Sequence, residues 1–238
     1  MIKKILKFIL KSVGLQKIPT LPSLSLQSAL ERIMVKDIKI ETVIDVGASN
    51  GSWSKIVQQY FPKAFYYLIE ANPYHLNSLE KFKLSSENID FLLAAAGDIN
   101  GEIYFDASDP FGGLASHTSS QGANIKVPIV TIDSVCKLHD FQPPFLIKLD
   151  THGFEIPIFE GASEILNKTN LVIVETYNFN IAENSLRFHK ICEYLENKGF
   201  RCIDICDPLF REKDLALWQF DLFFIRSDHP AFLCNSWK

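Results

Sequence analysis

Apolar residues along most of the chain fall into two alternating patterns. Short apolar runs predict strands over 42–46, 65–70, 89–95, 145–150 and 171–176. Between these runs, apolar residues recur every three or four positions, which predicts helices over 52–60, 73–84, 155–167 and 185–198. Strands that alternate with helices in this way are typical of a parallel sheet covered on both faces.

Further β segments are expected beside this main pattern. They are predicted over 101–107, 126–132, 200–206 and 219–226. The first two flank a polar loop at 108–124, and the last two would end the sheet as an antiparallel hairpin. A helix is expected over 26–36, and Asp133 is expected to cap the short helix that follows it. The predicted fold class is therefore α/β: a Rossmann-like sheet, mostly parallel, with an antiparallel C-terminal hairpin and helices on both faces.

The first 16 residues form a separate pattern. Ile2, Ile5, Leu6, Ile9, Leu10 and Val13 share one helical face, and Lys3, Lys4, Lys7 and Lys11 occupy the rest. This predicts a basic amphipathic helix that packs on the protein or a second subunit, or lies on an anionic membrane surface. We favour packing, because short amphipathic segments usually complete a core or an interface. We expect two parts: this helix with its connector (1–40) and a Rossmann-like domain (41–238).

Composition and charge narrow the choice of partners. A chain of 238 residues that is 47% hydrophobic can bury one large core. The formal net charge of -4 argues against a nucleic-acid partner, whose phosphates call for a basic face. The five cysteines are odd in number and lack a C-x-x-C pair, so we expect reduced thiols in a cytoplasmic protein. A zinc site at Cys202 and Cys206 is the alternative, and residues 1–16 allow contact with the inner face of the membrane.

A glycine turn after the first strand predicts a nucleoside site. Asp45, Gly47 and Gly51 form the pattern D-x-G-x-x-x-G, and Glu70 ends the next strand. An acid at this distance commonly holds an adenosine ribose. The pattern lacks the third glycine that lets a pyrophosphate approach the helix start, and Trp53 closes that flank. The turn therefore favours S-adenosylmethionine over a dinucleotide.

The carboxyl ends of parallel strands meet at one edge, which gathers the candidate cofactor-binding residues. They are Asp45, Gly47, Ala48, Gly51, Glu70, Asn72, Ala95 and Asp150. Glu70 is expected to accept hydrogen bonds from the ribose hydroxyls. Asp45 is expected to face the methionine ammonium or to brace the turn, and Ala95 leaves space for adenine.

The same edge carries the candidate catalytic residues Asp150, His152 and Glu175. Methyl transfer to a hydroxyl requires that its proton be removed, which suits an imidazole or a carboxylate. We expect His152 or Glu175 to be the base and Asp150 to position the acceptor or to bind a metal. A divalent cation is compatible with these ligand types, although nothing in their spacing requires one.

The acceptor is expected to meet aromatic and polar side chains at the rim of the site. Phe111 and His117 lie in the loop 108–124, and Tyr177 follows the fifth predicted strand. Such a loop at a site rim can close over a sugar or small-molecule acceptor. A solvated loop without a catalytic role is the alternative.

Five blocks of sequence form a further pattern: 43–51, 68–73, 127–133, 159–162 and above all IKLDTHGFE at 147–155. Together they resemble the FkbM-type methyltransferases, and the likeness covers about residues 42 to 178. The block K-x-D-x-x-G-x-E is its most specific part, although His152 stands where the family often has an acid. The resemblance implies a class I methyltransferase sheet and S-adenosylmethionine-dependent methylation of a hydroxyl on a sugar, glycan or small natural product. A nicotinamide-dependent oxidoreductase and a non-catalytic docking scaffold are the alternatives.

Overall fold

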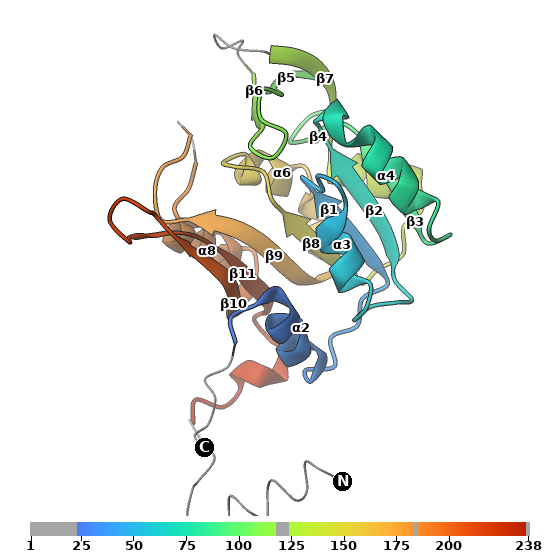
Figure 1. Cartoon of the computed structure of the whole chain (residues 1–238). Helices are drawn as coiled ribbons and strands as arrows, with labels where there is room; N and C mark the ends of the chain where they lie inside the picture. Colours follow the sequence, from blue (N-terminus) through green and yellow to red (C-terminus); the bar gives the residue numbers. More distant parts are fainter. Residues whose placement is uncertain (1–22, 118–123, 183–184, 237–238) are drawn as a thin grey trace, which may run out of the picture.

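The computed structural model describes residues 23–117, 124–182 and 185–236 (Figure 1). The amphipathic helix predicted within residues 1–16 lies outside these ranges. A seven-stranded sheet forms the centre of the molecule. Its strands, in spatial order, are β10 (Phe200–Phe210), β11 (Leu217–Arg226), β9 (Thr169–Tyr177), β8 (Phe145–Leu149), β1 (Thr42–Val46), β2 (Phe65–Glu70) and β3 (Ile89–Leu93).

The strand order reverses between β1 and β8. The chain runs outward from β1 to β2 and β3, and then returns to the other side of β1 with β8 and β9. All neighbouring strands of this sheet are parallel except β11, which is antiparallel to both β9 and β10. In open α/β sheets, ligands bind beyond the carboxyl ends of the strands at such a reversal. The predicted α/β fold class, with its C-terminal antiparallel hairpin, is confirmed.

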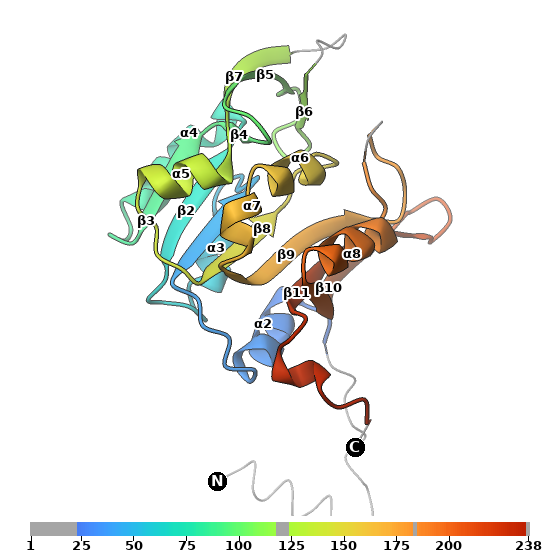
Figure 2. The same cartoon turned by 180° about the vertical axis from the view of Figure 1, so that it is seen from behind.

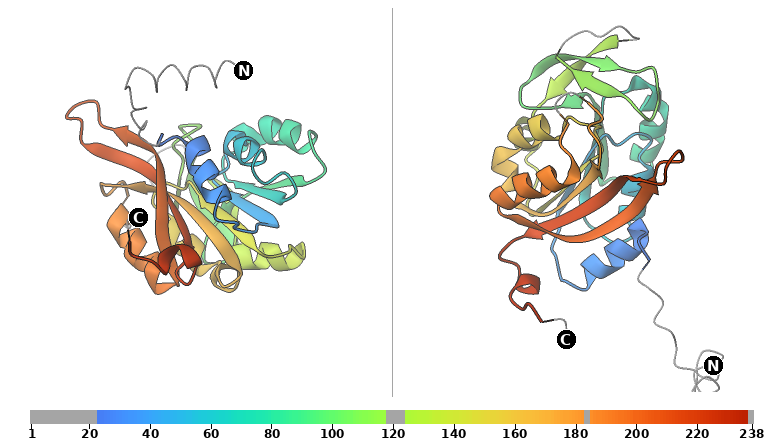
Figure 3. Two further views of the ribbon diagram at one scale, coloured as in Figure 1. Left: turned by 90° about the horizontal axis from the view of Figure 1, so that it is seen from below. Right: turned by 90° about the vertical axis from the view of Figure 1, so that its left-hand side faces the viewer.

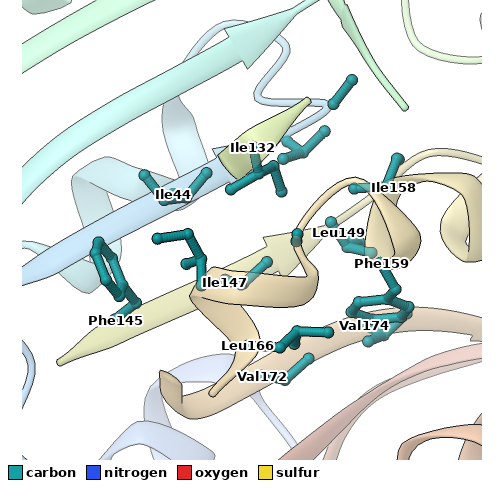
Figure 4. Packing of buried hydrophobic residues seen from close by; sticks show 14 of the residues in the cluster. Ile44, Ile132, Phe145, Ile147, Leu149, Ile158, Phe159, Leu166, Val172 and Val174 are labelled. Atoms are coloured by element: carbon teal, nitrogen blue, oxygen red, sulfur yellow. The ribbon is translucent and has the colours of Figure 1, made fainter. Parts of the chain in front are cut away.

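Helices cover both faces of the sheet, and each face has its own apolar core. On one face lie α2 (Leu26–Met34), α3 (Ser52–Val57) and α4 (Leu76–Lys83), the last preceded by the 3-10 turn Pro73–His75 (Figure 1). On the other lie α5 (Ile132–Leu138), α6 (Glu155–Glu160), α7 (Ser163–Leu166) and α8 (Phe188–Asn197) (Figure 2). Figure 4 shows the second core, where Ile147 and Val174 of the sheet pack beside Phe159 and Leu166. Alternate residues of β8 enter opposite cores, Leu146 on one face and Ile147 on the other, as a doubly covered strand requires.

A second, four-stranded sheet lies beyond one end of the main sheet (Figure 3). Its order is β4 (Ala95–Ala96), β7 (Asn124–Val130), β5 (Gly101–Asp106) and β6 (Leu114–Ser116). Ile103, Phe105 and Ile129 form its small core, against which Phe154 packs. The added β segments were predicted, but β6 lies inside the segment expected to be loop. The strand predicted over 89–95 ends at Leu93, because Ala95 and Ala96 pair with β7 instead.

The helix predicted over 155–167 is two helices, α6 and α7, separated at Gly161. A Cβ at Gly161 would lie 1.9 Å from the carbonyl oxygen of Gly97, which directly follows β4, so the two backbone segments are too close for a side chain at position 161. The prediction that Asp133 caps α5 is wrong. Thr131 is the N-cap of α5, and the Asp133 carboxylate accepts the backbone N–H groups of Glu164 and Ile165 at the start of α7.

Two further observations concern the environment of the protein. Within the described residues, no helix combines the length and the apolar character needed to cross a bilayer. All five cysteines lie in described segments and none forms a disulfide, although Cys234 is exposed rather than set in a core. Cys206 lies near Asp207 and Asp221 in the part of the chain that the structure describes, whereas Cys202 does not join this group.

Candidate active site

A cavity of about 450 Å³ opens at the carboxyl ends of β1, β2, β8 and β9. Its size suits a small organic ligand. Nine residues expected from the sequence line it: Gly47, Ala48, Glu70, Asn72, Ala95, Phe111, Asp150, His152 and Glu175. Asp45, Gly51, His117 and Tyr177 do not line it.

The glycine turn brings the end of β1 against the end of β8. Gly47 has a φ of +73°, and a Cβ there would lie 2.0 Å from the carbonyl oxygen of Asp150. Its backbone N–H donates to Ile69 of β2 at 2.9 Å. Gly51 has a φ of +79° and begins α3, where a Cβ would lie 2.8 Å from the ring of Phe82. Both glycines therefore permit a close approach of backbone to neighbouring elements.

Glu70 is held in place by backbone N–H groups from both sides. Its Oε2 accepts from Ser49 and its Oε1 accepts from Asn72, each at 2.6 Å. Burial raises the pKa of the Glu70 carboxyl, and these two hydrogen bonds offset part of that rise. Glu70 lines the cavity, and a carboxylate oxygen can accept more than one hydrogen bond, so Glu70 can also accept hydrogen bonds from a ligand.

Asp45 lies behind the site rather than in it. The carboxylate is fully buried and accepts a 2.6 Å hydrogen bond from the hydroxyl of Ser54 on α3. Burial raises the pKa of Asp45 to about 7. Of the two expected roles, the geometry supports bracing the turn rather than contact with a ligand.

Three side chains at the cavity surface, two from the loop after β8 and one from β9, lie close together. They are Asp150, His152 and Glu175, and we call them the strand-end triad. His152 Nε2 lies 3.6 Å from Glu175 Oε1 and 3.9 Å from Asp150 Oδ1. Gln219 donates to Glu175 Oε2 at 2.8 Å, and the Tyr177 hydroxyl donates to Oε1. Burial, with the charge of Asp150, raises the pKa of Glu175 to about 7. The triad thus offers proton-accepting groups at the cavity surface.

The remaining residues of the K-x-D-x-x-G-x-E block order this loop. Lys148 is buried, and its Nζ lies 2.9 Å from Asp221 Oδ1 and 3.7 Å from Asp150 Oδ2. Burial alone would lower the pKa of Lys148, but the neighbouring carboxylates together raise it, so it stays charged. Glu155 Oε1 accepts the backbone N–H of Gly153 at 2.7 Å. The block therefore fixes Asp150 and His152 at the end of β8.

Of the three residues predicted to contact the acceptor, one lines the cavity and two do not. Phe111 lines the cavity and is 65% exposed, so it is free to contact an acceptor. The ring of His117 instead packs against Phe154, with centroids 5.8 Å apart. Tyr177 is buried behind Glu175 and positions that carboxylate.

Sequence reasoning missed two contributors to the site, His75 and Gln219, and it identified Trp53 only as a residue that closes the flank of the glycine turn. His75 is buried with its Nε2 2.7 Å from the Pro110 carbonyl oxygen, and so holds the loop beneath Phe111. Gln219, from the C-terminal hairpin, reaches Glu175 only because β11 pairs with β9. The Trp53 ring lines the cavity, and its Nε1–H is buried with no hydrogen-bond partner among the described residues. No local sequence pattern identifies His75 or Gln219, because the role of each comes from a contact with a residue that is distant in sequence.

Comparison with known proteins assigns the family. A profile described as Methyltransferase FkbM domain matches residues 45–202, and the chain belongs to this methyltransferase family. The match covers the glycine turn, Glu70 and the strand-end triad.

Solved structures share the fold. The crystal structure of Methyltransferase FkbM from Methylobacillus flagellatus KT aligns with a TM-score of 0.51 at 14% identity, over 77% of this chain and 43% of that one. The fibrillarin pre-rRNA processing protein of Methanococcus jannaschii aligns with a TM-score of 0.51 at 16% identity, over 87% of this chain and 76% of that one. At these identities the likeness concerns the fold, which is that of the class I methyltransferases.

One curated relative has a named substrate class. Hexuronic acid methyltransferase AglP of Haloferax volcanii is 24% identical over 154 residues. The match covers 61% of this chain and 60% of the relative, so the chain corresponds to less than two thirds of that protein's length.

Proposed function

We propose that this protein is an S-adenosylmethionine-dependent O-methyltransferase whose acceptor is a hydroxyl group of a sugar or glycan. The observation that carries the proposal is the position of Glu70. Its carboxylate is fixed by two backbone N–H groups at the end of β2 and lies on the same cavity wall as Gly47. An acid at the end of the second strand, beside a glycine turn, is suited to hold the ribose diol of a nucleoside. For a methyltransferase, we therefore expect a donor that contains a ribose and no phosphates.

The cavity residues fit this donor. Glu70 would hold the ribose hydroxyls, and the small Ala95 would leave space for adenine. Gly47 and Ala48 would pass close to the methionine part. Trp53 contributes a buried N–H without a partner among the described residues, which a polar ligand could satisfy. When bound, the donor supplies a methyl group on a positively charged sulfur.

The strand-end triad would hold the acceptor hydroxyl. Transfer to oxygen depends on alignment of that oxygen with the methyl carbon and on removal of its proton. Asp150, His152 and Glu175 line the same cavity as Glu70, so fixed groups are available to hold the acceptor oxygen and to promote the loss of its proton. The acidic side chains of Asp150 and Glu175 also favour a positively charged donor at this end of the cavity.

Two observations support a saccharide acceptor. The curated relative named above is a hexuronic acid methyltransferase. The exposed ring of Phe111 at the cavity rim offers an apolar face of the kind that stacks on sugars. A formal charge of -4 disfavours a nucleic-acid acceptor.

The test is incubation of the purified chain with S-adenosylmethionine carrying a labelled methyl group and a panel of saccharides. The panel contains hexuronic acids, neutral hexoses and a nucleic-acid control. We expect label in a saccharide as a methyl ether, and none in the nucleic acid. Label only in the nucleic acid would contradict the acceptor class, and turnover of a nicotinamide cofactor instead would contradict the reaction.

A further inference from the structure

The strand-end triad has the arrangement of a metal site as well as that of a proton acceptor. One ligand atom from each of Asp150, His152 and Glu175 lies within 4.8 Å of the other two. We propose that they bind a divalent transition-metal ion on the cavity wall, and that this ion activates the acceptor hydroxyl. The role of the ion rests on the proposed function, whereas its binding does not.

The spacing of the three atoms fits one ion better than it fits direct hydrogen bonds. His152 Nε2 lies 3.6 Å from one carboxylate oxygen and 3.9 Å from the other, both beyond hydrogen-bond length. Two ligand atoms at about 2.1 Å from a common ion lie about 3.0 Å apart at a right angle and about 3.9 Å apart at 135°. The observed separations therefore need only small side-chain adjustments to converge on an ion.

Each carboxylate of the triad is oriented by a partner on its far side. Lys148 Nζ lies 3.7 Å from Asp150 Oδ2, and the other carboxylate oxygen, Oδ1, lies on the side of His152. Gln219 donates to Glu175 Oε2, and the hydroxyl of Tyr177 donates to Oε1, which retains a second lone pair. Metal ligands in proteins are commonly held by such outer hydrogen bonds.

Charge in this network favours a cation. Three acidic side chains, those of Asp150, Glu175 and Asp221, share this network with the single ammonium of Lys148. A divalent cation at the triad would therefore meet an excess of acidic groups. One imidazole with two carboxylates suits manganese, iron or zinc better than calcium.

The three ligands occupy one side of the proposed ion, so its remaining positions face the cavity. A hydroxyl of the acceptor, or a pair of neighbouring sugar hydroxyls, would complete the coordination there. The ion would make the reacting hydroxyl acidic, and its proton would pass to solvent water. The oxygen would then form the new C–O bond as the C–S bond breaks, its electron pair leaving with sulfur as a neutral thioether. His152 would act as a ligand and not as the proton acceptor.

Mn²⁺ alone, added to the full chain after treatment with a chelator and dialysis, is the probe. Electron paramagnetic resonance is expected to show about one tightly bound Mn²⁺ per chain. His152→Asn and Glu175→Gln should each weaken binding by at least about tenfold. Asparagine is chosen at position 152 because φ there is +52°, a conformation that asparagine tolerates. His189→Ala, at an exposed histidine on α8, is the control and should bind Mn²⁺ as the unaltered chain does.

Absence of bound Mn²⁺ in the unaltered chain, or equal binding by His152→Asn and the control, would overturn the proposal. Binding of S-adenosylhomocysteine by each variant checks that its cavity is intact. In the activity assay, we expect chelation to remove methyl transfer and Mn²⁺ to restore it. Full methyl transfer after chelation would overturn the metal site and leave the methyltransferase function in place.

Discussion

The carboxylate of Glu70 accepts a 2.6 Å hydrogen bond from the backbone N–H of Ser49, and this bond joins the end of β2 to the turn after β1. A second bond of equal length, from Asn72, closes the other side of the carboxylate. The acid and the glycine turn are therefore one unit. These bonds fix the carboxylate relative to the turn without a ligand.

Gly47→Ala is expected to destabilise the protein and abolish methyl transfer. The new Cβ would lie 2.0 Å from the Asp150 carbonyl oxygen in a backbone conformation of φ +73°. We expect the free energy of unfolding in urea to fall by at least about 2 kcal/mol. Lys55→Ala, at an exposed position on α3, is the control and should change it by less than about 0.5 kcal/mol. Equal stability of the two variants would show that the turn tolerates a side chain.

The raised pKa of Asp45 predicts a specific dependence of stability on pH. Burial raises the pKa of folded Asp45 to about 7 from an ordinary value of 3.8. Between these pH values the unfolded chain loses this proton and the folded chain keeps it, so the contribution of Asp45 to stability falls as pH rises from about 4 to about 7. Asp45→Asn cannot ionise and should gain stability relative to the unaltered chain over that interval, by up to about 4 kcal/mol.

Urea unfolding of both proteins at pH 5 and pH 8 measures this difference. Asp37→Asn, at an exposed aspartate, is the matched control and should show no such change. A difference between Asp45→Asn and the unaltered chain that stays constant across the pH range would mean that Asp45 is charged in the folded protein.

The sequence predicted most of the main sheet because its strands are buried on both faces. β1, β2, β8 and β9 read as short, mainly apolar runs, and an acid lies at or near the carboxyl end of each. The carboxyl-edge rule then placed Glu70, Asp150 and Glu175 around one cavity, as the structure has them.

The remaining features depend on contacts between distant segments. The break between α6 and α7 lies where Gly161 approaches Gly97. The apolar pattern of residues 155–167 contains no information about this contact. Asp133 is a residue type that often caps helices, but its carboxylate accepts a hydrogen bond at the start of α7 rather than of α5. Likewise, His117 was expected at the acceptor site but packs on Phe154, because β6 redirects its segment.

Tyr177 is expected to act as a positioning residue. Tyr177→Phe removes the hydroxyl that donates to Glu175 Oε1 and keeps the buried ring. A lost hydrogen bond of about 1 kcal/mol corresponds to a fall in kcat of about fivefold to tenfold. Affinity for S-adenosylhomocysteine should be unchanged, because Tyr177 does not line the cavity. A loss of that affinity with kcat preserved would contradict the assignment.

His75 is expected to hold the loop beneath Phe111. Its Nε2–H donates to the Pro110 carbonyl oxygen at 2.7 Å, and its ring lies 5.3 Å from that of Phe111. His75→Leu keeps an apolar side chain and removes this donor. Hydrogen exchange followed by mass spectrometry should show faster exchange across 108–113, with exchange in β8 unchanged. Equal exchange in both proteins would mean that other contacts, such as that of Asn72 with Asp109, suffice.

Isothermal titration with S-adenosylhomocysteine tests the central claim most directly. The unaltered chain should bind one equivalent and should not bind NAD. Glu70→Ala should weaken binding by about tenfold or more, since a hydrogen bond to a charged group contributes about 1.5–3 kcal/mol. Glu102→Ala, at an exposed acid on β5, should bind as the unaltered chain does. Absence of heat with the unaltered chain, or an unchanged affinity in Glu70→Ala, would contradict the assignment of this cavity to the methyl donor.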